Sequence, residues 1–278
     1  MNKSKRMTTA RETVDILDHG AYRAPSGRTV EIAGRLAAAV RGTVLHRPAE
    51  LDALLAALPP APPGAATRVE VTGETTLQAA RRLGADGTVP LALNFASAKN
   101  PGGGFLNGAL SQEEDLARSS GLYPTLLAAR EYYDFHRAQG DLLYSDHMVY
   151  SPAVPVLRAD DGALLEEPYD VAFLTSAAPN RGAIRDPRVA ARIPAALRLR
   201  ARKVLAAALA HGHGRLVLGA WGCGVFRNDP AEVAGVFADA LRPGGEFAGR
   251  FEQVTFAVWD SAQGAPRQAA FERVFASF

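Results

Sequence analysis

The chain has 278 residues, of which 47% are hydrophobic and 22% charged, and its formal net charge is +2. This is an ordinary composition for a globular protein, and a chain of this length buries a core without covalent staples. The single cysteine, Cys223, excludes a disulfide framework within the chain and a cysteine-based zinc site. The small net charge gives no argument for nucleic-acid binding, and no apolar run approaches the roughly 20 residues of a membrane span.

The N-terminal quarter predicts an accessory segment. The basic first residues lack the apolar core of a secretion signal, and Thr9 with Glu12 forms a capping box for a short helix that ends at Gly20. A hairpin around residues 25–27 and helices near 33–41 and 49–58 follow. The proline-rich residues 58–64 indicate a stiff linker or, as we favour, a long loop. We therefore expect one domain over residues 1–278, with residues 1–64 packed on its core.

The rest of the chain alternates between apolar strands and helices. Such alternation favours an α/β fold with a mostly parallel sheet covered by helices on both faces. The strand at 148–157 contains prolines, which indicates an edge or a bend. We expect strands at 68–72, 89–95, 148–157, 170–175, 215–219 and 253–259, and helices at 75–83, 111–120, 124–138, 187–210, 230–241 and 266–276.

The loop after the strand ending at Phe95 carries the densest functional signal. Three consecutive glycines, Gly102 to Gly104, allow backbone N–H groups to approach an anion closely. Alone, such a run is more often a flexible loop. The acidic cluster Gln112-Glu113-Glu114-Asp115 follows at a predicted helix start, where one or two carboxylates are ordinary. A helix terminus does not explain why these carboxylates come directly after a glycine-rich loop, so we expect a ligand site there.

Two further loops lie at predicted strand ends, which is where ligands bind in sheets of this kind. The first, residues 219–229, contains Gly219, Gly222 and Gly224 ahead of a helix, as phosphate-binding loops do, although it has neither a Walker motif nor a dinucleotide-binding glycine pattern. Phe226 in this loop either stacks on a ligand or anchors the loop. The second loop, residues 175–180, contains small residues that leave room for a ligand.

These motifs together resemble the poly(ADP-ribose) glycohydrolases, a catalytic branch of the macrodomains. The family signature is Gly-Gly-Gly followed, after six to eight residues, by Gln-Glu-Glu, and here seven residues separate Gly104 from Gln112. The loop with Gly222, Gly224, Val225 and Phe226 is similar to the family's diphosphate loop. The resemblance extends from about residue 8 to the C-terminus and is strongest to the bacterial-type enzymes. It implies a three-layer α/β/α sandwich with a mixed, mostly parallel sheet and an N-terminal helical extension.

The resemblance also implies roles for individual residues. Glu114 corresponds to the catalytic glutamate, and Glu113 would position the distal ribose through its hydroxyls. No motif marks the adenine pocket, for which Glu12, Thr13 and residues 176–180 are weak candidates. The residues that would contact the substrate are Asn100, Gly102, Gly103, Gly104, Gln112, Ala177, Asn180, Gly222, Gly224, Val225 and Phe226.

The predicted reaction is hydrolysis of the ribose–ribose O-glycosidic bond, which needs a proton on the leaving oxygen and support for an oxocarbenium-like centre. Adjacent helical residues point about 100° apart, so Glu113 and Glu114 are not expected to flank the bond as a glycosidase pair. We expect Glu114 alone to donate the proton and then activate water, which requires a carboxyl that burial or Glu113 keeps protonated. No metal or cofactor is required.

Several alternatives stay open at this point. The chain could be a macrodomain that binds ADP-ribose without cleaving it, or a hydrolase of ADP-ribose linked to protein or nucleic acid. A hydrolase with Cys223 as nucleophile is a further alternative, because a cysteine near a helix N-terminus can be activated. His211 and His213 are interpreted as a helix cap, and the arginine-rich residues 181–203 as a solvated helix face, although such charge would also favour an anionic substrate.

The expected partners are poly(ADP-ribose) or ADP-ribosylated macromolecules as substrate and ADP-ribose as product. The sequence predicts no membrane association and no stable protein partner, and a cytoplasmic monomer is the expected form.

Overall fold

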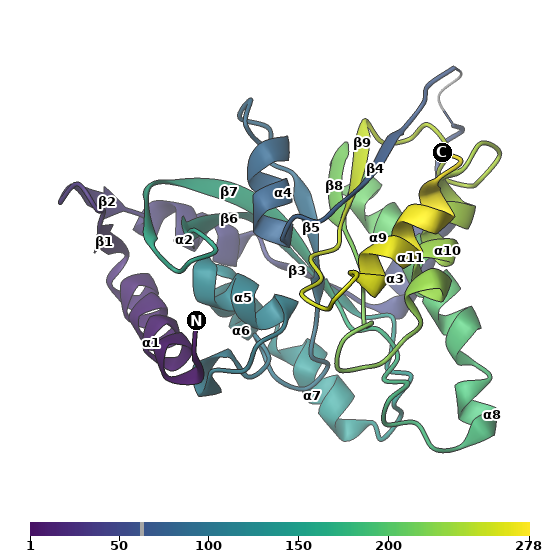
Figure 1. Ribbon diagram of the computed structural model, residues 1–278, viewed down its shortest axis with the longest axis horizontal. Coiled ribbons are helices and arrows are strands. Elements are labelled where there is room, and N and C mark those ends of the chain that lie inside the picture. Colours follow the sequence, from purple (N-terminus) through teal and green to yellow (C-terminus); the bar gives the residue numbers. More distant parts are fainter. Residues whose placement is uncertain (62–63) are drawn as a thin grey trace.

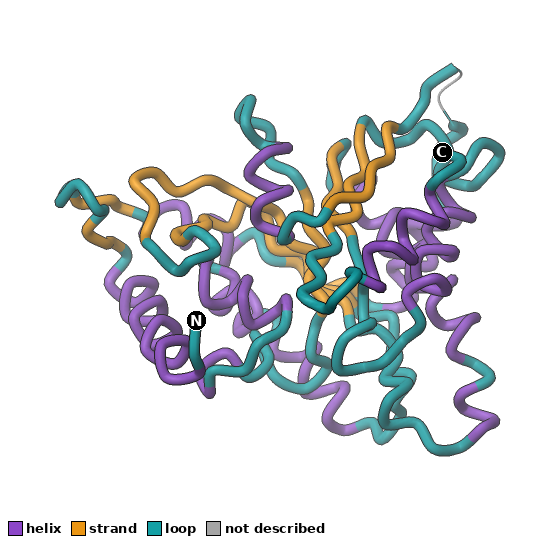
Figure 2. The backbone as a smooth tube through the Cα atoms, in the orientation of Figure 1, coloured by secondary structure: helices purple, strands orange, loops and turns teal. Residues whose placement is uncertain are grey.

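The computed structural model describes residues 1–61 and 64–278, so Pro62 and Pro63 of the predicted linker lie outside the described residues. A seven-stranded sheet runs through the molecule with helices on both sides (Figures 1 and 2). From one edge to the other its strands are β3 (Val44–His46), β6 (Met148–Arg158), β7 (Leu164–Ser176), β5 (Leu91–Phe95), β8 (Arg215–Leu218), β9 (Gln253–Ala257) and β4 (Arg68–Thr72).

The strand β6 runs opposite to the other six strands of the sheet. The pairs β7–β5, β5–β8, β8–β9 and β9–β4 are parallel, whereas β3–β6 and β6–β7 are antiparallel. The predicted mixed, mostly parallel sheet is therefore confirmed. Because β5 lies between β7 and β8, the loops that leave the carboxyl ends of these three strands are neighbours in space.

Two hydrophobic layers account for the burial of the central strands. Successive side chains of a strand point to opposite faces. In β5, Leu91 and Leu93 pack in one cluster, while Ala92 between them packs in the other. The first cluster joins the sheet to α3 (Pro48–Ala56), α9 (Ile193–Ala210), α10 (Pro230–Leu241) and α11 (Pro266–Phe275). The second joins it to α2 (Ala33–Arg41), α4 (Thr76–Leu83), α5 (Gln112–Ser119), α6 (Leu122–Ala128) and α7 (Arg130–Ala138).

The N-terminal segment packs on the sheet and also contributes to it. The helix α1 (Lys3–His19) begins seven residues earlier than its sequence predicts, since the Asn2 side chain caps it and Thr9 lies inside it. The hairpin β1 (Ala21–Arg23) and β2 (Thr29–Glu31) is present as predicted. The strand β3, which was not predicted, is only three residues long and pairs with β6. A three-residue edge strand is too short to show a hydrophobic periodicity, and its conformation depends on its pairing with β6.

Three further predicted elements differ from the structure. The helix expected at 124–138 is split into α6 and α7 at Ala129. The helix expected at 187–210 is split into α8 (Pro187–Ala190) and α9, because Pro194 starts a new helix. The strand expected at 170–175 begins at Leu164, and its first half forms a hairpin with β6 around Gly162. Because Glu166 and Glu167 are charged, the sequence of this first half lacks the apolar run that indicates a buried strand.

The prolines of β6 produce a bend, as predicted. The pairing of β6 with β7 shifts register between Ser151 and Val154, and Ala153 has a φ of 43°. On the other side, β3 pairs only with Met148 to Tyr150. Pro152 and Pro155 therefore lie beyond the paired residues of β3, where a missing N–H donor costs no hydrogen bond to that strand.

Two imidazoles lie against each other where the C-terminal end of α9 meets β3. His211 is the C-cap residue of α9, as predicted, and its Nε2 atom lies 2.8 Å from Nε2 of His46 on β3. The Tyr150 ring stacks on His211 with ring centroids 3.5 Å apart. One of the two facing nitrogens must be without a proton to accept this hydrogen bond. Burial, together with the charges of His46 and His213, lowers the pKa of His211 to about 4, and burial also lowers the pKa of His46.

Acidification is expected to destabilise the fold through this pair. Below the ordinary pKa of 6.5, and down to about 4, the unfolded chain takes up protons that the folded His211 does not accept. Between about pH 7.5 and about pH 5, the free energy of unfolding should fall by on the order of 1 kcal/mol through His211, allowing for its partial exposure. Urea unfolding of the wild type and of His211→Asn at both pH values measures the difference. Equal pH dependence in the two proteins would contradict the prediction, because the other buried histidines contribute to both.

Candidate active site

The residues predicted from sequence to form the site gather at one edge of the sheet. The loops after β5, β7 and β8 carry them, and these loops are adjacent because the three strands are neighbours. The carboxyl ends of parallel strands are also where ligands bind in this class of sheet. The structure therefore places the glycine loop, the loop of small residues and the second glycine-rich loop around one region.

The glycine loop adopts a conformation that requires glycine. Gly102 and Gly103 have φ values of 69° and 61°, in the left-handed region. A Cβ atom added to Gly103 would lie 2.3 Å from Oε1 of Glu114 and 3.2 Å from Oε2 of Glu113. The N–H of Gly104 donates a hydrogen bond of 3.0 Å to Oε1 of Glu114. The loop backbone therefore lies so close to both carboxyl groups that a residue with a side chain would not fit at position 103.

Glu113 is a buried carboxyl group, with 2% of its surface exposed. Its Oε2 accepts a hydrogen bond of 2.6 Å from the Ser97 N–H, and its Oε1 accepts one of 3.3 Å from Nδ2 of Asn94. Burial raises the pKa of Glu113 to about 8, with a further contribution from the charge of Glu114. At neutral pH Glu113 is therefore mainly protonated, and it is the carboxyl of the pair that burial keeps neutral.

Glu114 follows directly in α5 but is only partly buried. Both carboxyl groups lie against Gly103, so they are on the same side of the space in front of the loop. This arrangement agrees with the expectation that they do not flank a bond from opposite sides. It leaves one accessible carboxyl, Glu114, supported by a buried neighbour.

The hydrogen bonds of the Gln112 side chain fix the positions of the two glutamates that follow it. Its Oε1 accepts a hydrogen bond of 2.8 Å from the Phe95 N–H, and its Nε2 donates one of 2.8 Å to the Leu93 carbonyl. The amide also reaches Thr76 of α4. The first residue of α5 is thereby fixed to the end of β5. Since both groups of the amide are occupied by protein atoms, contact between Gln112 and a substrate stays a prediction.

A buried arginine holds the far end of the same loop and was not predicted from the sequence. Arg118, 1% exposed, donates a hydrogen bond of 3.0 Å to the Ala109 carbonyl and pairs with Asp115. Its own carbonyl accepts a hydrogen bond of 2.7 Å from Thr13 of α1. Thr13, a weak candidate for adenine contact, is fully buried and occupied in this way. The helical spacing of three residues between Asp115 and Arg118 was the only sequence signal for this arginine.

The second glycine-rich loop is tied to the loop after β7. Gly222 has a φ of 71°, and an added Cβ atom would lie 2.5 Å from Cβ of Ala178. The side chain of Asn228, 2% exposed, donates hydrogen bonds of 2.8 Å to the Pro179 carbonyl and 3.2 Å to the Gly222 carbonyl. The two loops are therefore held at a fixed separation. Asn228 was missed from the sequence because an asparagine before a helix is usually a cap.

The remaining predicted contact residues differ in their accessibility. Gly224 is exposed, and a Cβ atom added to it would meet nothing within 4 Å. Val225 is 76% exposed, while Phe226 is half buried. Asn100 is exposed, and its carbonyl accepts a hydrogen bond of 2.9 Å from the Gly103 N–H. Ala177 is fully buried. Direct contact of each with a substrate stays a prediction.

Cys223 is a poor nucleophile in this structure. Burial raises the pKa of its thiol to about 12, and its Sγ lies 3.7 Å from the Trp221 carbonyl. A thiol with so high a pKa carries almost no thiolate at neutral pH. The alternative of a cysteine hydrolase therefore loses its physical basis.

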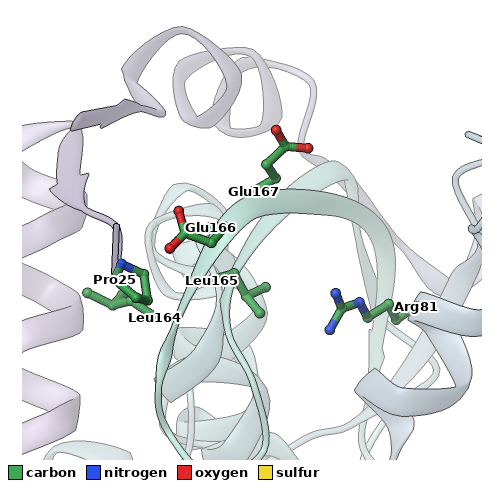
Figure 3. Close-up of a pocket in the computed structure, with 6 residues that line it drawn as sticks. All are labelled: Pro25, Arg81, Leu164, Leu165, Glu166 and Glu167. Atoms are coloured by element: carbon green, nitrogen blue, oxygen red, sulfur yellow. The ribbon is translucent and has the colours of Figure 1, made fainter. Parts of the chain in front are cut away.

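A cavity of about 500 Å³ lies elsewhere in the molecule, between the β1–β2 hairpin, α4 and the start of β7 (Figure 3). Pro25, Leu164 and Leu165 line it together with the charged Arg81, Glu166 and Glu167. None of its lining residues comes from the three loops described above. Within residues 1–61 and 64–278, no three His, Cys, Asp or Glu side chains gather as a metal ion would need. No helix in this described part is long and apolar enough to cross a membrane.

The protonation of Glu113 predicts a loss of stability at alkaline pH. The folded chain holds a proton that the unfolded chain releases above the ordinary pKa of 4.5, so stability declines as the pH rises toward about 8. From about pH 6 to about pH 9 the decline should be on the order of 2 kcal/mol. Glu113→Gln keeps the shape but cannot ionise, so this decline should be absent. Urea unfolding across this range measures it, and parallel curves for the two proteins would show the assignment to be wrong.

Comparison with known proteins identifies the family. The family described as "Microbial-type PARG, catalytic domain" matches residues 10–159. The crystal structure of poly(ADP-ribose) glycohydrolase from Thermomonospora curvata is 64% identical, covers 98% of this chain and 100% of its own, and gives a TM-score of 0.95.

A second similar structure is poly(ADP-ribose) glycohydrolase from Deinococcus radiodurans in complex with ADP-ribose. It is 48% identical, covers 89% of this chain and 99% of its own, and gives a TM-score of 0.83. No curated protein matches the chain. With a family match over more than half of its length and a relative that covers nearly all of it, this chain belongs to the microbial-type poly(ADP-ribose) glycohydrolases.

Proposed function

We propose that this chain hydrolyses the ribose–ribose O-glycosidic bond of poly(ADP-ribose) and releases ADP-ribose from chain ends, with Glu114 as general acid and base. The observation that carries the proposal is the pair of unlike carboxyl groups at the glycine loop. Glu113 is buried and mainly neutral, and Glu114 is accessible and held by the Gly104 N–H. The relatives support it, since the D. radiodurans enzyme binds ADP-ribose and the T. curvata enzyme binds the inhibitor ADP-HPD.

The chemistry follows from the positions of these groups. The bond between C1 of the distal ribose and the oxygen of the next unit breaks as that oxygen takes the proton of Glu114. The diphosphate of the same ADP-ribose, held near the two glycine-rich loops, stabilises the cationic sugar. Water then adds to C1 and returns a proton to Glu114.

Glu113 would act on binding rather than on the proton transfer. A neutral carboxyl both donates and accepts hydrogen bonds, so it suits the hydroxyls of a ribose. It also adds no second negative charge next to a diphosphate. We propose that the remaining contacts with the substrate are made by Asn100, Gly102 to Gly104, Gly222, Gly224, Val225, Phe226, Ala177 and Asn180.

We propose that residues 1–278 form one catalytic domain. The strand β3 of the N-terminal segment pairs with β6 of the main sheet, and Arg6 of α1 donates a hydrogen bond of 2.8 Å to the Gly108 carbonyl in the loop that leads into α5. The single cysteine suits a reducing cytoplasmic compartment.

Replacing Glu114 by Gln should abolish release of ADP-ribose while ADP-ribose binding remains. Loss of a general acid costs about a thousandfold in rate. Release is measured by chromatography on poly(ADP-ribose), and binding by calorimetry. Binding without release in both proteins would instead indicate a non-catalytic macrodomain, or a hydrolase of ADP-ribose linked to protein or nucleic acid. Equal release by both would show that Glu114 is not the acid.

Gly103→Ala should reduce kcat/KM by about a hundredfold, because the added methyl group would displace the Glu114 carboxyl. Gly87→Ala is the matched control. Gly87 also has a positive φ, of 89°, but an added Cβ atom meets nothing within 4 Å. Both variants should lose about 1 kcal/mol of stability from the backbone conformation. Equal activity of the two variants would contradict the close approach at Gly103.

A further inference from the structure

An aromatic residue at the edge of the site has a strained backbone. Tyr144, in the segment between α7 and β6, has a φ of 57°, which side chains other than glycine and asparagine rarely adopt. Such conformations persist only where surrounding contacts impose them, and they cluster at functional sites.

Arg200 of α9 holds the backbone. Although the sequence predicts a solvated helix face here, Arg200 is 2% exposed. Its guanidinium donates hydrogen bonds of 3.1 Å to the Leu143 carbonyl, 3.3 Å to the Tyr144 carbonyl and 2.7 Å to the Ala177 carbonyl. One planar side chain thus connects the segment before β6 with the loop after β7.

Asp146 keeps this arginine in place. It accepts a hydrogen bond of 2.9 Å from Nε of Arg200 and one of 2.8 Å from Nζ of the buried Lys203. Lys203 also pairs with Asp52 at 2.7 Å. The prediction of a solvated face is thus wrong for two of its cations, because the carbonyls and carboxylates that bind them come from distant parts of the chain.

The side chain of Tyr144 lies among the predicted contact residues. Its hydroxyl accepts a hydrogen bond of 3.4 Å from Nδ2 of Asn180, and its ring centroid lies 5.8 Å from that of Phe226. Tyr144 is half buried. In the described part of the chain no hydrogen bond takes the proton of the hydroxyl, which leaves it for an acceptor on a ligand.

We propose that Tyr144 is a substrate-binding residue, which packs its ring with Phe226 against a sugar of the ADP-ribose unit and donates its hydroxyl proton to a ribose or phosphate oxygen. Arg200 is the positioning residue that holds Tyr144 there. This inference rests on the proposed function, since it assigns a further contact in the same site. A phenol suits the task because it offers a flat apolar face and one polar end.

Two substitutions of Tyr144 separate the ring, the hydroxyl and the strain. Tyr144→Phe removes only the hydroxyl and should weaken ADP-ribose binding about threefold. Tyr144→Gly removes the ring but relieves the positive φ, so binding should weaken about tenfold while the melting temperature stays equal or rises. Binding is measured by calorimetry with ADP-ribose, together with KM and kcat for release of ADP-ribose from the polymer.

Ala153→Gly is the matched control for relief of strain. Ala153 also has a positive φ, of 43°, but lies in the bend of β6 outside the three loops. This variant should bind ADP-ribose as the wild type does. Wild-type binding in Tyr144→Phe and Tyr144→Gly would overturn the inference alone. Absence of binding by the wild type would overturn the proposed function and this inference with it.

The role of Arg200 is tested by Arg200→Lys, which keeps the charge next to Asp146 but lacks the fork that reaches three carbonyls. KM should rise about tenfold with little change in kcat, because the acid and its loop are untouched. Arg198→Lys, on the same helix with its side chain 63% exposed, should leave both constants unchanged. A fall in kcat with unchanged KM, or no difference between the two variants, would overturn the positioning role.

Discussion

The hydrogen bonds between Gln112 and the end of β5 are the constraint on which the site depends. They fix the first residue of α5 to the backbone of Phe95 and Leu93. Once this residue is fixed, helical geometry leaves no freedom for the next two. Glu113 turns into the protein toward Asn94, and Glu114 turns toward the glycine loop. A glutamine is suited to this position because its amide satisfies a backbone N–H and a backbone carbonyl together.

Two adjacent carboxyl groups consequently occupy unlike environments. Burial makes the ionised form of Glu113 costly, so that residue keeps its proton, whereas Glu114 is accessible and is held by a single backbone N–H. If both were ionised, they would repel each other and the diphosphate of an anionic substrate. The absence of a side chain at Gly103 is part of the same arrangement, because any Cβ atom there would occupy the position of the Glu114 carboxyl.

Sequence reasoning succeeded where the signal is local and failed where the partner is distant. The sheet, most helices and the three site loops follow from apolar runs, glycine positions and one motif spacing. The start of α1 was misplaced because two capping sequences compete and Asn2 wins over Thr9. The strand β3 depends on pairing with β6, about 100 residues away. Arg200 is buried by partners that are 23 or more residues away. No local sequence pattern indicates either of these contacts. Asn228 likewise bonds to a residue that is distant in the sequence, the Pro179 carbonyl.

The buried cations that local patterns missed share one mode of action. Arg118 and Arg200 each donate hydrogen bonds to main-chain carbonyls of irregular segments, at Ala109 and Ala177 among others. Arg158, the last residue of β6 and 3% exposed, does the same at Gly162. The carbonyl groups of a loop lack the regular backbone hydrogen bonds of a helix or sheet. A guanidinium group has five N–H donors and can hydrogen-bond to several of these carbonyls at once. Fixing these segments before a ligand arrives removes ordering costs from binding. The strained backbone of Tyr144 is a consequence of the same principle, because a network strong enough to impose a left-handed tyrosine also keeps its ring facing the site in the absence of substrate.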